Sequence, residues 1–153
     1  MKNNMNLSTL FSELSLTGGF SYNTTTGESN PTTGYMVSLR DHEQMFYFDD
    51  FENKDIKNYF VRHVNVLSDE SSFLGGWVNE NQVYLDVSIN IPNLEDAIYY
   101  GIIGGQKAIW DCVNSREIVL PSPQRSGTMT QNKTYNEMKA RQLACLIQTT
   151  GIE

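Results

Sequence analysis

The sequence feature that most constrains the fold is a strict alternation of aliphatic and polar residues from Val83 to Ile91. The aliphatic positions are Val83, Leu85, Val87, Ile89 and Ile91, and the polar positions between them are Tyr84, Asp86, Ser88 and Asn90. Because successive side chains of a strand point to opposite faces, this pattern predicts a strand with one apolar face and one polar face. Residues 73–78 form a second apolar run, and residues 79–82 between the runs predict a hairpin connection. The rest of the fold can be arranged around this hairpin.

The length and the ends of the chain indicate a compartment. A chain of 153 residues fits one domain that buries about two thirds of the surface of its unfolded chain. No charged segment followed by an apolar segment opens the chain, and no apolar run reaches the roughly 18 residues of a membrane span. Cys112 and Cys145 lie far apart beside apolar residues, as reduced thiols do. We therefore expect a cytoplasmic protein that does not span a membrane.

The net charge narrows the range of partners. Eleven basic and 18 acidic residues give a formal charge of -7, which argues against direct nucleic-acid binding and mildly favours basic partners. A well-solvated surface would explain the same charge. Adjacent acidic pairs occur only at residues 49–50, 69–70 and 95–96, so mimicry of DNA is the less favoured explanation.

Helical periodicity appears in four segments. Residues 7–14 carry a narrow apolar stripe that Asn6 or Ser8 could cap, and residues 54–67 form a longer helix with Asn53 as the expected N-cap. Asn93 is placed to cap a helix over residues 94–103. A terminal helix is predicted from a capping box at Thr134, with Glu137 three residues later.

These patterns predict an α+β fold. Five to seven short, mainly antiparallel strands would form a single twisted sheet, and the helices near residues 54–67 and 94–103 would pack on one face of it. The inward row would comprise aliphatic and aromatic residues, namely Val83, Leu85, Val87, Ile89, Ile56, Phe60, Val64, Ala97 and Ile98. We expect a core domain over residues 1–120, a linker over residues 121–133 and a C-terminal helix over residues 134–153.

The terminal helix carries seven apolar positions, which it must bury because an isolated helix of about 15 residues is marginal in water. It would pack back on the sheet, or lie in a groove of a second copy or of another protein. Of these alternatives we favour a homodimer through residues 134–150.

A series of short motifs carries a resemblance to a known family. The motifs are Gly18-Gly19-Phe20, Thr26-Gly27-Glu28, residues 33–38, Gly75-Gly76-Trp77, residues 84–88 and residues 106–111. In this succession the chain resembles a family of small, mostly uncharacterised bacteriophage and mobile-element proteins, some encoded beside anti-restriction genes or within large polyvalent phage proteins. The resemblance covers about residues 17–120. It implies a phage or mobile-element setting and a role against host defence, and it implies no catalytic residues.

Candidate binding residues lie on the central hairpin and on a later one. Gly75 and Gly76 beside Trp77 would let a ligand approach the backbone, or would form a β-bulge. The polar row Tyr84, Asp86, Ser88 and Asn90 would bind a ligand or partner strand, or would form a solvated sheet face. Trp110 and Asp111 complete the candidate set.

Catalytic and metal chemistry find little support in the sequence. Asp86 and Asp111 could act as an acid and a base, or hold a metal, only if both faced one pocket. His42 and His63 lack the spacing of a zinc site. The sequence contains no Gly-x-Ser-x-Gly motif, phosphate-binding loop or dinucleotide-binding fingerprint. We therefore predict no catalytic residues, no metal site and no cofactor.

These observations lead to two hypotheses of function from different classes. The first is a non-enzymatic phage or mobile-element protein of the anti-CRISPR or anti-restriction type, which binds and inhibits a host defence protein such as a nuclease. The alternative is a protein that binds a small molecule or nucleotide and so sequesters a defence signal. A small enzyme is the third and least favoured reading.

Overall fold

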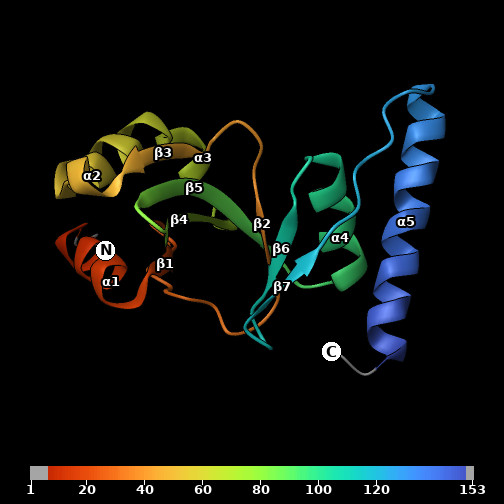
Figure 1. Ribbon diagram of the computed structural model, residues 1–153, viewed down its shortest axis with the longest axis horizontal. Helices are drawn as coiled ribbons and strands as arrows, with labels where there is room; N and C mark the ends of the chain where they lie inside the picture. Colours follow the sequence, from red (N-terminus) through yellow and green to blue (C-terminus); the bar gives the residue numbers. More distant parts are fainter. Residues whose placement is uncertain (1–6, 151–153) are drawn as a thin grey trace. The chain divides into compact units, whose positions relative to one another are not determined.

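The computed structural model describes residues 7–150. In chain order the elements are α1 (Leu7–Thr17), β1 (Gly19–Tyr22), β2 (Tyr35–Ser38), β3 (Gln44–Tyr47), the 3₁₀ helix η1 (Phe48–Asp50), α2 (Asn53–Arg62), α3 (Val64–Leu67), β4 (Ser72–Asn79), β5 (Gln82–Ile91), α4 (Leu94–Ile103), β6 (Ala108–Asp111), β7 (Arg116–Val119) and α5 (Met129–Thr149) (Figure 1). The seven strands form one mainly antiparallel sheet in the order β1-β4-β5-β2-β6-β7, with β3 also paired to β5. The predicted α+β fold class is confirmed.

The chain divides into two compact units. The first unit comprises residues 1–31 and 41–89, and it holds α1, β1, β3, η1, α2, α3, β4 and most of β5. The second unit comprises residues 32–40 and 90–153, and it holds β2, α4, β6, β7 and α5. The last two residues of β5 belong to the second unit, so this strand runs from one unit into the other.

The core of the first unit follows from the alternation in β5. Val83, Leu85 and Val87 are fully buried, as their spacing predicts. Their neighbours in β4 and β1, Leu74 and Phe20, are also buried. The same alternation fails on the other face, where Asp86 and Ser88 are buried rather than solvated. The prediction of a solvated polar face was therefore wrong, because polarity in the sequence does not report what covers a face.

The helix expected over residues 54–67 is two helices. Its regular geometry breaks at His63, which ends α2 and precedes α3. Glu52, not Asn53, is the N-cap, because Glu52 and Asp55 form a reciprocal capping box. After the break Val64, predicted to be buried, is exposed, whereas Leu67 is fully buried.

The first helix ends at Thr17, immediately before a glycine. Gly18 has a left-handed φ of 88°, and its N–H donates to the carbonyl of Leu14. Leu10 and Leu14 are buried on the inner face of this helix. Asn6, one of the expected caps, lies outside the described residues.

Two helices pack against each other in the second unit. Asn93 caps α4 by accepting from the N–H of Asp96, as predicted. Helix α5 lies beside α4 (Figure 1) and buries Ala140, Ala144 and Ile147.

The terminal helix begins earlier than expected. It starts at Met129, and its capping box joins Thr128 and Gln131 rather than Thr134 and Glu137. The prediction was wrong because the first turns of α5 are polar, and apolar periodicity begins only after they end. None of the described helices is both long enough and apolar enough to cross a bilayer.

Candidate functional site

Three neighbouring strands of the first unit bring large side chains into one row. The register places Met45 opposite Tyr84, and Tyr84 opposite Trp77. Residues that lie directly opposite in antiparallel strands share a face of the sheet, so this row crosses β3, β5 and β4. Tyr47 is two residues beyond Met45 and therefore lies on the same face, in the next row. We refer to Met45, Tyr47, Trp77 and Tyr84 as the aromatic face.

The aromatic face is both open and ordered. Trp77 and Met45 are each 39% exposed, and Tyr47 is 56% exposed. The rings of Trp77 and Tyr84 stack with centroids 4.2 Å apart and an interplanar angle of 12°. The Tyr84 hydroxyl donates to Oε1 of Gln82 at 2.8 Å, which fixes the ring at its far end. Exposed aromatic side chains that are already held in place lose little conformational entropy when a partner binds. Such side chains are enriched at the centres of protein interfaces.

The two glycines beside Trp77 are required by packing inside the sheet. Residues 72–79 pair with residues 82–89 without interruption, so the glycines form no bulge, and the bulge interpretation was wrong. A Cβ at Gly76 would lie 2.5 Å from the Phe20 ring, and a Cβ at Gly75 would clash with the Asp86 carboxylate. The space that a ligand would need above either backbone is therefore occupied by the chain itself.

The predicted polar row does not form one continuous surface. Asp86 and Ser88 are buried on the face that carries Trp77 and Tyr84. Burial and, secondarily, the charge of Asp86 raise the pKa of Tyr59. Asn90 lies in the second unit, where its side-chain amide donates to the carbonyl of Thr33 at 3.0 Å.

Asp111 shapes its own hairpin. Its carboxylate accepts from the N–H groups of Val113 and Asn114 at 3.1 and 3.2 Å, and from the Asn114 side chain at 2.9 Å. Arg116 Nε adds an ion pair at 3.3 Å. Burial raises the pKa of Asp111, but the hydrogen bonds from Asn114, Arg116 and Val113 outweigh it and hold this pKa below its usual value. The adjacent Trp110 is 42% exposed on β6, in the second unit, so this predicted binding residue is not part of the aromatic face.

The structure also brings together two histidines that the sequence does not connect. Nδ1 of His42 lies 3.0 Å from Nδ1 of His63, and the Tyr59 hydroxyl donates to the carbonyl of His42. Burial, followed by the charges of His42 and Arg62, lowers the pKa of His63. The two residues are 21 positions apart, so no local spacing could have paired them. Within residues 7–150 no group of three or more His, Cys, Asp or Glu residues is placed to hold a metal ion.

Exposed acidic residues border the aromatic face at the hairpin turn. Glu80 is exposed at the turn between β4 and β5, and Asp49 and Asp50 are exposed in η1, directly after β3. The N–H of Phe48 donates to the carbonyl of Asn81 at 2.7 Å, which joins η1 to this turn. In the described part of the chain no lysine or arginine forms an ion pair with these three carboxylates. We refer to Asp49, Asp50 and Glu80 as the acidic rim.

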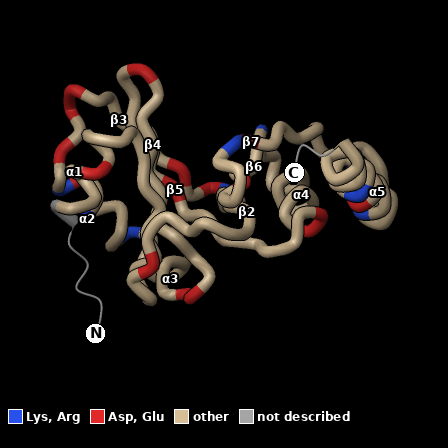
Figure 2. Tube along the Cα trace, turned by 90° about the horizontal axis from the view of Figure 1, so that it is seen from below, with Lys and Arg blue, Asp and Glu red and all other residues tan. Residues whose placement is uncertain are grey.

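The acidic rim belongs to a wider segregation of charge. The first unit contains 12 acidic and 4 basic residues, a formal charge of -8, whereas the second contains 6 acidic and 7 basic residues, a formal charge of +1. Figure 2 shows the acidic positions repeated along the elements of the first unit, while α5 carries both signs. The net charge of the chain is therefore a property of one unit.

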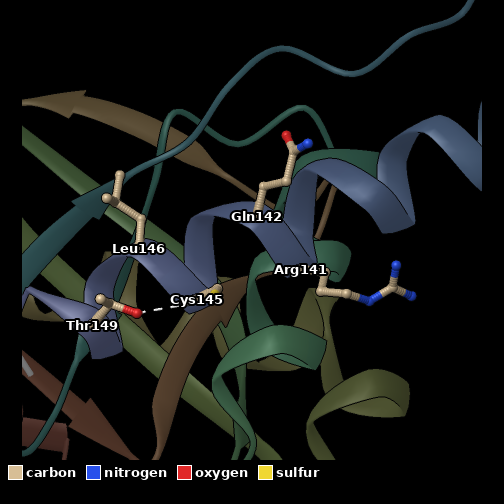
Figure 3. A pocket seen from close by; sticks show the side chains of 5 residues that line it. All are labelled: Arg141, Gln142, Cys145, Leu146 and Thr149. Atoms are coloured by element: carbon tan, nitrogen blue, oxygen red, sulfur yellow. Dashed lines mark hydrogen bonds between the residues drawn. The ribbon is translucent and has the colours of Figure 1, made fainter.

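A shallow hollow also lies along α5 (Figure 3). It is lined by residues of this helix alone, namely Arg141, Gln142, Cys145, Leu146 and Thr149. Leu146 is 59% exposed, and Sγ of Cys145 lies 3.9 Å from Oγ1 of Thr149. Because all five residues come from one helix, the hollow has no opposing wall that could enclose a small molecule.

Comparison of the chain with models of protein families, with curated proteins and with solved structures found no match in any of the three.

Proposed function

We propose that this chain is a non-enzymatic binding protein whose aromatic face contacts a partner protein. The observation that carries the proposal is the cross-strand row of Met45, Tyr84 and Trp77, with Tyr47 beside it, held in place and open to solvent. Tryptophan and tyrosine contribute most to the binding energy of protein interfaces, since they bury a large area with few rotatable bonds.

The partner that we propose is a defence protein of a bacterial host, for example a restriction or CRISPR nuclease, bound in the host cytoplasm. This part of the proposal rests on the resemblance of residues 17–120 to phage and mobile-element proteins. The acidic first unit supports it, because many proteins that act on DNA present basic surfaces.

A plaque assay with matched tryptophan variants tests the proposal. The chain would be expressed in bacteria that carry an active restriction or CRISPR system, and phage plating efficiency would be measured. We expect the wild-type chain to raise plating efficiency and Trp77→Ala to abolish the gain. Trp110→Ala is the control, because Trp110 is exposed to nearly the same extent, 42% against 39%, but lies on a different unit.

Equal activity of the two tryptophan variants would contradict a role for the aromatic face. Failure of the wild-type chain against every system tested would contradict the anti-defence role. Circular dichroism of both variants would establish that each has kept its fold.

A small-molecule or nucleotide-binding protein that sequesters a defence signal is the second candidate. The exposed indole of Trp77, next to the stacked Tyr84 ring, is the feature that favours it, because aromatic rings stack on nucleobases. The acidic rim opposes it, since carboxylates repel phosphates. Mass spectrometry of molecules released by denaturing the purified protein distinguishes the two candidates: a stoichiometric nucleotide would favour the second.

A further inference from the structure

We infer that the aromatic face and the acidic rim together form a docking surface for a basic polypeptide segment, one that carries arginine or lysine side chains among apolar ones. The inference rests on the proposed function and names the chemistry of the partner. Two features of the structure carry it: the place of the rim relative to the aromatic rows, and the segregation of charge between the units.

The acidic rim lies at the end of the aromatic face that is next to the turn between β4 and β5. Tyr47 is opposite Gln82, and Gln82 is opposite Asn79, so this row is the last before the turn that carries Glu80. Asp49 and Asp50 follow Tyr47 by two and three residues. Each of the three carboxylates is therefore a few residues from an exposed aromatic ring, and each is solvated and without an ion pair in the described chain.

Arginine suits both parts of this surface. Its guanidinium group is planar, so it stacks on the face of tryptophan or tyrosine and can donate to a carboxylate at the same time. The exposed rings of Trp77 and Tyr47 offer such faces, and the rim offers the acceptors. Apolar side chains of the same segment would cover Met45.

The charge of the first unit disfavours other occupants of this docking surface. A second copy of this surface would bring two units of formal charge -8 together, and their mutual repulsion opposes a symmetric dimer there. Nucleic acids and anionic membranes are repelled for the same reason. A basic polypeptide is the macromolecule that gains from both the rings and the carboxylates.

Fluorescence anisotropy with two labelled peptides of equal length tests the inference. One peptide alternates arginine with leucine, and the other alternates glutamate with leucine. We expect the full chain to bind only the arginine peptide, and to bind it about tenfold more weakly at 300 mM than at 50 mM NaCl. Trp77→Ala should weaken binding about tenfold or more, whereas Trp110→Ala should not change it.

A variant of the acidic rim tests whether its charges contribute to binding. The triple variant Asp49→Asn, Asp50→Asn, Glu80→Gln should weaken binding of the arginine peptide about tenfold at 50 mM NaCl and remove most of the salt dependence. The control variant Glu28→Gln, Glu70→Gln, Glu117→Gln removes the same number of charges from exposed positions outside the rim. It should lose much less affinity.

The outcomes are separable from those of the proposed function. Equal binding of the glutamate peptide, or equal losses in the rim and control variants, would overturn the inference. If no peptide binds, the plaque assay tests the inference instead. A rim variant that keeps full anti-defence activity, while Trp77→Ala loses it, would overturn the basic partner. The aromatic face would then remain the proposed binding surface. Loss of activity in the rim variant alongside an active control variant would support the inference.

Discussion

The two units of the chain differ in the balance of their charged residues. In the second unit three of the six acidic residues form ion pairs within the fold: Asp111 with Arg116, Glu137 with Lys133, and Glu95 with Arg141. In the first unit, 12 acidic residues are balanced by only 4 basic ones, and the ion pair of Glu52 with Lys54 is solvent-exposed. Self-repulsion of this kind lowers stability and does nothing to define the fold. We propose that this surplus serves recognition of a partner.

The units can also be compared by the apolar side chains that they bury and expose. The second unit packs α5 against α4 and buries Ala140, Ala144 and Ile147. The first unit leaves the rings of Tyr47 on β3 and Trp77 on β4 partly exposed, and both of these strands pair with β5. The second unit also exposes rings, at Tyr100 and Trp110. The first unit, which we propose for binding, is distinguished by the combination of exposed rings with a surplus of acidic residues.

The largest expected effects come from matched truncations in the two cores. Leu85→Ala in the first unit and Ile98→Ala in the second each remove a fully buried side chain, and each should lower the free energy of unfolding by about 2 to 5 kcal/mol. Urea unfolding followed by tryptophan fluorescence would measure both. Because β5 runs through both units, we expect each truncation to destabilise the whole chain.

Single-tryptophan variants make this test specific to each unit. Trp110→Phe leaves Trp77 to report on the first unit, and Trp77→Phe leaves Trp110 to report on the second. Coincident urea midpoints from the two reporters would establish one cooperative fold. Separate midpoints, with Leu85→Ala shifting that of Trp77 alone, would instead show that the units unfold independently.

Removal of the buried ion pair in the second unit comes next in size. Asp111→Ala leaves the N–H groups of Val113 and Asn114 without their acceptor and leaves Arg116 without its partner. We expect the free energy of unfolding to fall by about 3 kcal/mol. Thermal unfolding would show the loss, and Glu117→Gln, an exposed neighbour on the same hairpin, is the control. A loss no larger than that of the control would contradict a structural role for Asp111.

The sequence predicted features that depend on residues close together in the chain better than features that depend on distant residues. The alternation in β5 predicted the buried row Val83, Leu85 and Val87 because period 2 acts within one strand. Trp77 and Tyr84 were candidates because they lie on the same hairpin. Met45 and Tyr47 were not, because the register that places them beside Tyr84 joins segments nearly 40 residues apart in sequence.

Two further misses have different causes. The burial of Asp86 and Ser88 is decided by what lies over the sheet, which alternation cannot report. The early start of α5 was missed because periodicity detects only apolar faces, and the box formed by Thr128 and Gln131 precedes that face. Local chemistry identified the cap of α4 and the buried row of β5, whereas the composition of the aromatic face depended on strand register.

A smaller effect is expected on the outer surface of α5. The homodimer through residues 134–150 stays a prediction, and since α4 covers the inner face, it now depends on the exposed residues Met138 and Leu146. The second unit suits self-association better than the first because its formal charge is only +1. Light scattering should give about twice the 17.4 kDa mass at high protein concentration, and Leu146→Glu should restore the single-chain mass. Met129→Glu, exposed at the start of the helix, is the control. A wild-type chain that is already monomeric would rule the dimer out.

The smallest effect concerns the histidine pair in the first unit. The pKa of His63 is lowered in the folded chain from its usual value near 6.5, chiefly by burial and also by His42 and Arg62. The unfolded chain therefore binds more protons than the folded chain around and below that pH, so stability falls as the pH drops from 7 to 5. His63→Gln removes this proton uptake, and the fall in Tm between pH 7 and pH 5 should shrink by about 2 °C. His42→Gln keeps the imidazole of His63 but removes one of the groups that lower its pKa, so the fall in Tm of this variant should lie between those of the wild type and His63→Gln. Because the carboxylates of the acidic rim are present in all three proteins, their contribution cancels in the comparison. An unchanged fall in Tm in His63→Gln would contradict a linkage between this pair and folding.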